Sequence, residues 1–190
     1  MFAEGPLEIH KCVRYSDHAL KLFFEKVSRQ PWFKNTLFVL TADHTNQAEH
    51  PEYMTELGRF AVPILFYTPD GELQGYRNAI AQQIDIMPTV LGYLGYDKPF
   101  VSFGCNLLRT PAEDTYAVNY TNGIYQYVKG DYLLQFDGDK TIAVYAFKAD
   151  KLLKNNLIGT IQEQAAMERE LKSIIQQYME RMNSDKMTVE

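Results

Sequence analysis

Residues 37–44 read Leu-Phe-Val-Leu-Thr-Ala-Asp-His, and this stretch decides how the first half of the chain folds. Its four leading apolar residues are typical of a buried strand. A carboxylate and an imidazole, Asp43 and His44, follow directly. In open α/β sheets, ligands and metals collect at the carboxyl ends of the strands. The pair is therefore a candidate site for a divalent cation, and the alternative is a strand-end Asp beside a His bonded to backbone.

The neighbouring segments predict an α/β layer. Apolar residues recur at three- and four-residue steps over about 8–29, which is typical of an amphipathic helix. We expect strands over 36–42 and 61–67, and a helix over about 86–94 with Asp85 as its N-cap. The order helix, strand, loop, strand, helix favours a mostly parallel sheet.

The pattern changes after residue 110. Runs rich in Tyr, Val, Ile and Phe are separated by Gly-containing turns, which predicts a four-stranded antiparallel meander. The runs are 115–121, 124–129, 131–137 and 141–147. Apolar residues between 161 and 182 recur with a helical period, so we expect a terminal helix that covers this sheet. We divide the chain into an α/β portion, 1–110, and a sheet-plus-helix subdomain, 111–190.

Composition narrows the possible functions. The 190 residues are 46% hydrophobic, as in a folded globular protein, and their net charge of -5 argues against a nonspecific nucleic-acid binder. The two cysteines are too few for a disulfide framework. No stretch approaches the roughly 20 apolar residues that cross a bilayer, and no signal sequence is evident.

Four motifs, in a fixed order, carry a resemblance to a known family. They are Tyr-Ser-Asp at 15–17, Asn-Thr-Leu-Phe-Val-Leu-Thr-Ala-Asp-His-Thr at 35–45, Arg-Phe-Ala-Val-Pro-Ile-Leu-Phe-Tyr at 59–67 and Gln-Ile-Asp-Ile-Met-Pro-Thr at 83–89. Together they resemble the C-terminal part of sulfatase-like enzymes of the alkaline phosphatase superfamily, most closely the lipoteichoic acid synthase or phosphoglycerol transferase branch. The resemblance covers about 8–109 and implies an alkaline-phosphatase-like sheet portion with flanking helices.

The resemblance also implies a catalytic metal. In that family an Asp–His pair at a strand end ligates the metal, and the pair maps onto Asp43 and His44, with Mn²⁺, Mg²⁺, Zn²⁺ or Ca²⁺ as the candidate ion. The nucleophile and a further acidic ligand lie far upstream in family sequences, whereas 42 residues precede Asp43 here. We therefore expect a C-terminal fragment that supplies two metal ligands, lacks the nucleophile and is inactive without the N-terminal part of the same enzyme.

Two further polar residues are candidates for substrate binding. His50 and Arg59 could contact a phosphate or sulfate oxygen, although an exposed loop His and a surface salt bridge are the alternatives. The implied substrate is a sulfate or phosphate ester of a glycan or lipid. The implied location is the cell envelope, with the parent protein anchored in the membrane and its catalytic domain outside it.

Thr45 and Cys105 have nucleophilic side chains but are poor candidates for the nucleophile. Thr45 is placed wrongly for the family, and Cys105 lies after the metal pair in a segment that only superficially echoes a sulfatase signature. We expect Cys105 to be a buried or partly buried thiol.

A non-enzymatic function is the competing hypothesis. In it, the chain is a binding or assembly module with a vestigial Asp–His pair, and exposed apolar edges could allow self-association.

Overall fold

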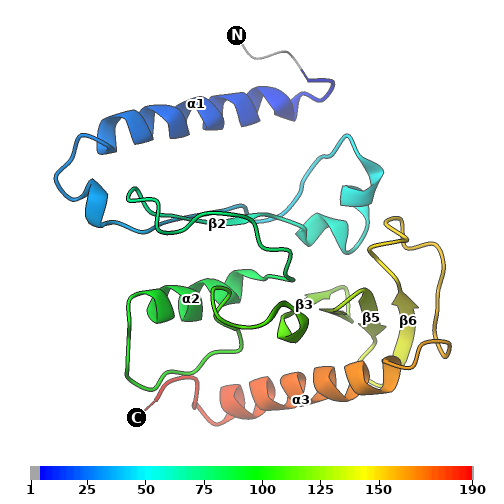
Figure 1. Cartoon of the computed structure of the whole chain (residues 1–190). Helices are drawn as coiled ribbons and strands as arrows, with labels where there is room; N and C mark the ends of the chain where they lie inside the picture. Colours follow the sequence, from blue (N-terminus) through cyan, green and yellow to red (C-terminus); the bar gives the residue numbers. More distant parts are fainter. Residues whose placement is uncertain (1–4, 190) are drawn as a thin grey trace. The chain divides into compact units, whose positions relative to one another are not determined.

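The computed structural model describes residues 5–189, which form two compact units, 5–76 and 77–189 (Figure 1). The first contains helix α1 (Ile9–Val27) and strands β1 (Phe38–Thr41) and β2 (Ile64–Tyr67). The second contains helices α2 (Ile86–Tyr93) and α3 (Gln164–Asn183), and strands β3 (Tyr116–Thr121), β4 (Ile124–Lys129), β5 (Tyr132–Phe136) and β6 (Thr141–Tyr145). No described helix combines the length and apolar character needed to cross a bilayer.

Strands β1 and β2 pair in the first unit, but not as expected. They are antiparallel, with Phe38 opposite Tyr67 and Thr41 opposite Ile64. The prediction of a mostly parallel sheet is therefore wrong for the strands described here. A parallel pair needs a crossover, usually a helix, whereas the connection here contains only short 3₁₀ turns and returns to the end where it began.

Helix α1 packs on this strand pair through its C-terminal end. The Phe24 ring lies 5.2 Å from the Phe38 ring and 5.8 Å from the Tyr67 ring, measured between centroids. Val27 at the helix end is buried, whereas Val13 is 56% exposed. The amphipathic helix predicted over 8–29 is thus present, and its apolar contacts gather in its last turns.

The second unit confirms the predicted meander. Its sheet has the order β3-β4-β5-β6 with every neighbouring pair antiparallel. Asn122 and Gly123 join β3 to β4 with φ angles of 53° and 84°. Positive φ at both central residues is the signature of a type I′ turn, whose twist matches that of the strands.

Helix α3 covers one face of this sheet, as expected. Met167 and Leu171 are buried against the sheet residues Tyr127, Leu134 and Val144. An ionic contact reinforces the packing, because the Glu170 carboxylate accepts hydrogen bonds from Tyr127 Oη at 2.8 Å and from Lys129 Nζ at 2.8 and 2.9 Å. The core of the second unit therefore lies between the sheet and α3.

Asp85 occupies the N-cap position of α2, as expected, but its side chain bonds elsewhere. Its Oδ2 accepts from Gln82 N at 2.9 Å and its Oδ1 from Cys105 N at 2.7 Å, and it makes no side-chain cap bond to α2. The carboxylate instead closes a 3₁₀ turn (Gln83–Asp85) and ties it to the loop before β3. The side chain has no exposed surface, and burial raises the pKa of the Asp85 carboxyl in spite of the two N–H donors. The predicted boundary at residue 110 stays a prediction.

Candidate functional site

Asp43 and His44 lie side by side just after β1. His44 N donates to Asp43 Oδ1 at 2.8 Å, and His44 Nε2 lies 3.6 Å from Asp43 Oδ2. The side chain of Asp43 is 84% exposed and that of His44 is 60% exposed. The chain folds this way because Thr41, the last residue of β1, is held by a hydrogen bond from its Oγ1 to Pro63 O at 2.9 Å. The pairing of β1 with β2 therefore positions the backbone from which Asp43 and His44 project.

The electrostatics of the pair favour an ionised carboxylate. The hydrogen bond from His44 N lowers the pKa of the Asp43 carboxyl, and the nearby His44 ring contributes in the same direction. A carboxylate and a neutral imidazole are the protonation states in which these groups ligate metals.

A folded loop connects the pair to β2. Thr45 N donates to Arg59 O at 2.8 Å, which joins the two ends of the loop. Within it, Thr55 Oγ1 donates to Glu52 O and accepts from Gly58 N, both at 2.9 Å. A Cβ on Gly58 would lie 1.9 Å from Glu52 O, so only glycine fits there. This long polar loop, which has no obvious structure in the sequence, is thus ordered by local bonds.

The loop places the two predicted substrate contacts differently. The backbone of Arg59 is bonded to Thr45, next to His44, and its side chain is exposed. His50 precedes the 3₁₀ turn Pro51–Met54 and is also exposed. The backbone of Arg59 is thus held beside Asp43 and His44 through Thr45. The structure gives no contact between His50 and these two residues. The sequence does not predict that Thr55 and Gly58 order the loop, because their only signal is the spacing Thr-x-x-Gly.

The donor set fits a divalent metal in part. In an ideal tetrahedral site with bonds near 2.1 Å, two ligand atoms lie roughly 3.4 Å apart. The distance between His44 Nε2 and Asp43 Oδ2 is 3.6 Å, close to that value. The described residues contain no cluster of three or more His, Cys, Asp or Glu side chains that could hold an ion. Asp43 and His44 therefore offer two ligands and leave the coordination sphere incomplete.

Cys105 is a partly buried thiol, as expected. The thiol is free rather than in a disulfide. Burial, together with the nearby Asp85 carboxylate, raises the pKa of the Cys105 thiol. A raised pKa keeps the sulfur in its protonated, poorly nucleophilic form at neutral pH.

Comparison with known proteins shows which proteins this chain resembles. The sulfatase family model matches residues 8–96, which include the metal pair, the loop and α2. Lipoteichoic acid synthase 1 of Bacillus subtilis is 30% identical over 123 residues, covering 58% of this chain and 19% of that protein. Residues 8–96 therefore form a sulfatase-family domain, and the chain is similar to lipoteichoic acid synthases. It spans about a fifth of the length of this lipoteichoic acid synthase.

Solved structures show the same fold. A protein of the alkaline phosphatase superfamily from Vibrio parahaemolyticus superposes with a TM-score of 0.76 at 22% identity, over 100% of this chain and 47% of that one. A second structure, of BT4656 in complex with its substrate D-glucosamine-2-N,6-O-disulfate, has a TM-score of 0.66 at 22% identity and covers 88% of this chain and 40% of that one. The sulfatase-like fold therefore extends over both units.

Proposed function

We propose that this chain is part of a metal-dependent enzyme acting on anionic esters, in which Asp43 and His44 are two of the metal ligands. The observation that carries the proposal is their juxtaposition after β1, inside the segment that matches the sulfatase family. A bound divalent ion would neutralise negative charge on the substrate and lower the pKa of an attacking oxygen.

The residues of this chain would hold and orient the reactants. Asp43 and His44 provide donors of the hard and borderline types that Mn²⁺, Mg²⁺, Zn²⁺ and Ca²⁺ accept. Arg59 is tied by its backbone to the residue after His44, so its guanidinium is the better placed of the two candidates for a phosphate or sulfate oxygen. His50 would serve as a second donor to the substrate, or protonate a leaving oxygen.

The substrate we propose is a sulfate or phosphate ester of a glycan or lipid. The names of the relatives support it: one is a lipoteichoic acid synthase, and another was solved with a disulfated glucosamine as its substrate. By the same resemblance, we place the parent protein at the cell envelope, anchored in the membrane. The isolated chain is expected to lack turnover, because two protein ligands and no family nucleophile do not make a complete centre.

Metal-dependent thermal stability tests the proposal. Millimolar Mn²⁺ or Zn²⁺ should stabilise the wild-type chain by about 1 kcal/mol, a rise in Tm of about 2–4 °C. Asp43→Asn should abolish the shift. Its Tm without metal should match that of the wild type, because the side chain is exposed.

The matched control is Asp70→Asn in the same unit. Asp70 is also exposed, and its carboxylate accepts a hydrogen bond from Glu72 N, two residues on, without an adjacent imidazole. This variant should keep the full shift. A shift that survives Asp43→Asn, or that disappears equally in Asp70→Asn, would contradict the assignment.

A further inference from the structure

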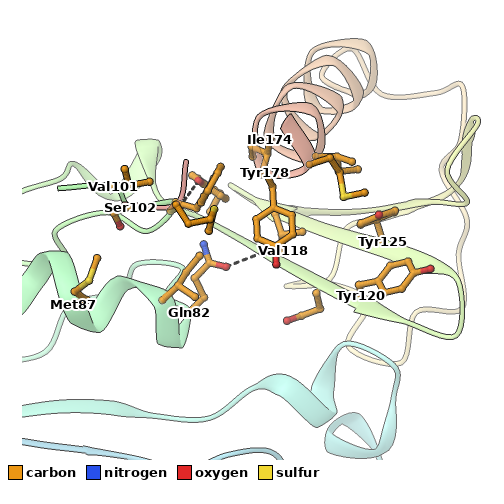
Figure 2. A pocket seen from close by; sticks show the side chains of 16 residues that line it. Gln82, Met87, Val101, Ser102, Val118, Tyr120, Tyr125, Ile174 and Tyr178 are labelled. Atoms are coloured by element: carbon orange, nitrogen blue, oxygen red, sulfur yellow. Dashed lines mark hydrogen bonds between the residues drawn. The ribbon is translucent and has the colours of Figure 1, made fainter. Parts of the chain in front are cut away.

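The second unit contains a half-open cavity of about 640 Å³, separate in the sequence from Asp43 and His44. This volume lies within the range of about 300–1,000 Å³ that is typical of small-molecule sites. Figure 2 shows the side chains that line it. They come from β3, β4, α3, the turn at residues 82–87 and the loop at 101–103, with one residue, Met187, after α3.

The walls of the cavity are ordered aromatic and aliphatic side chains. The rings of Tyr120 and Tyr125 are tilted against each other with centroids 4.5 Å apart, and those of Phe103 and Tyr178 meet edge to face at 5.6 Å. Tyr116 Oη donates to Phe103 O at 2.6 Å, which fastens the loop to the sheet. The cavity is thus built by contacts that hold without a ligand.

No charged side chain occurs among the described residues that line this space. A charged group that entered it would lose its water shell without gaining a counter-ion, which disfavours its binding. The lining therefore selects against carboxylates, phosphates and amines.

One polar group in the lining lacks a partner. Gln82 Nε2 is buried, and among the described residues no hydrogen-bond acceptor reaches it. The amide cannot be reversed, because Gln82 Oε1 accepts from Val118 N at 3.1 Å and the side chain also accepts from Asp85 N. Figure 2 shows the amide nitrogen turned toward the side chains of the cavity. A buried N–H group without an acceptor destabilises the folded chain, so an acceptor supplied by a ligand would recover this energy.

We propose that this cavity binds an uncharged, lipid-like molecule whose carbonyl oxygen accepts a hydrogen bond from Gln82 Nε2. The apolar lining takes the hydrocarbon part, and the absence of charge among its residues excludes a free acid. Three methionines, Met87, Met179 and Met187, lie in the lining and are partly exposed. Their flexible side chains can shift to admit a chain and open the way to the amide. The proposal is independent of the metal site and goes beyond the function proposed above.

A ligand series on the intact chain tests the role of the carbonyl. Calorimetric titration with 1-monolauroylglycerol, below its micelle-forming concentration, should show saturable binding. 1-O-Dodecylglycerol has a chain of equal length but no carbonyl, and should bind roughly three- to tenfold more weakly, as expected for one lost hydrogen bond. Laurate should bind at least about tenfold more weakly than the ester, because of its charge. Equal affinities for the ester and the ether, or no saturable binding of the ester, would overturn the proposal.

A pair of variants tests the location. Met179→Glu places a charge at the cavity from a residue that is 47% exposed, so the fold should be kept and the affinity for 1-monolauroylglycerol reduced by about tenfold or more. Leu152→Glu makes the same change in charge at a residue of the same unit that is 38% exposed and outside the cavity, and should bind like the wild type. Equal losses in both variants, or none in Met179→Glu, would contradict this site.

Discussion

The exposure of Asp43 and His44 determines what these two residues can do alone. Both are more than half exposed, so water competes with them for a metal ion and nothing around them excludes it. Two donors give low affinity, whereas a full coordination sphere from a larger domain would give high affinity. We therefore expect Asp43 and His44 to bind a metal ion weakly in this chain.

Asp85 is the residue at which a single substitution should be most damaging. Asp85→Ala removes a fully buried carboxylate that accepts from Gln82 N and Cys105 N, and leaves both donors without it. We expect a loss of about 2–4 kcal/mol in the free energy of unfolding, measured by urea denaturation. Asp97→Ala, at an exposed position of the same unit, should change it by less than about 0.5 kcal/mol. A loss below about 1 kcal/mol in Asp85→Ala would contradict this role.

The features that the sequence predicts well are those with local signals. Asp43 and His44 are recognisable as a candidate pair because both follow one apolar run, and the helix expected over about 86–94 is present as Ile86–Tyr93. The partners of Asp85 and Gln82 could not be predicted, because Cys105 is 20 residues from Asp85 and Val118 is 36 residues from Gln82. Polar contacts between distant segments leave no periodic pattern in the sequence.

At the scale of elements, the direction of a strand could be predicted only where the residues of a short turn determine it. The β3–β4 hairpin was correctly predicted because Asn122–Gly123 permits a two-residue turn. The direction of β2 relative to β1 was wrongly predicted, because an apolar run alone does not reveal which way a long connection returns. The loop between them depends on Thr45, Thr55 and Gly58, whose bonds are invisible to hydrophobic periodicity.

The attachment of α3 to the sheet should depend on pH through Glu170. Burial opposes ionisation, but the hydrogen bonds from Lys129 and Tyr127 outweigh it and lower the pKa of the Glu170 carboxyl below its usual 4.5. A lowered pKa stabilises the folded state above pH 4.5, and this contribution is lost as the pH falls through the folded-state value. Because the side chain is 43% exposed, we expect only about 0.5–1 kcal/mol.

Unfolding of Glu170→Gln at several pH values measures this contribution. The variant should be less stable than the wild type by about 0.5–1 kcal/mol near pH 7, and the two should converge as the pH falls below 4.5 and through the folded-state pKa of Glu170. Glu113→Gln, which changes an exposed carboxylate of the same unit, should follow the wild type throughout. A difference that grows as the pH falls would refute the assigned direction.

At the scale of the whole molecule, the chain has a fold that is found within larger proteins. It covers 47% of a solved structure with the same fold and 19% of a lipoteichoic acid synthase. The described residues hold no cluster of three or more candidate ligand side chains, and the site that we propose has two, Asp43 and His44. From two ligands we expect weak metal binding and no group transfer by this chain alone.

Turnover by the purified chain tests this consequence. We expect no hydrolysis of aryl phosphates or aryl sulfates above background in the presence of Mn²⁺, Mg²⁺, Zn²⁺ or Ca²⁺. Any residual activity should be equal in His44→Ala, which would identify it as contamination. Turnover by the wild type that is lost in His44→Ala would show that the chain contains a complete active centre.

Paramagnetic line broadening is the most direct test of the claim that Asp43 and His44 hold the metal. Mn²⁺ titrated into ¹⁵N-labelled chain should broaden the backbone amide signals of residues 43–45 first, at concentrations where the signals around Asp70 are unaffected. Asp43→Asn should remove that selectivity. If the signals of residues 43–45 stay sharp while those of other carboxylate-rich segments broaden, the metal site is elsewhere and the account is wrong.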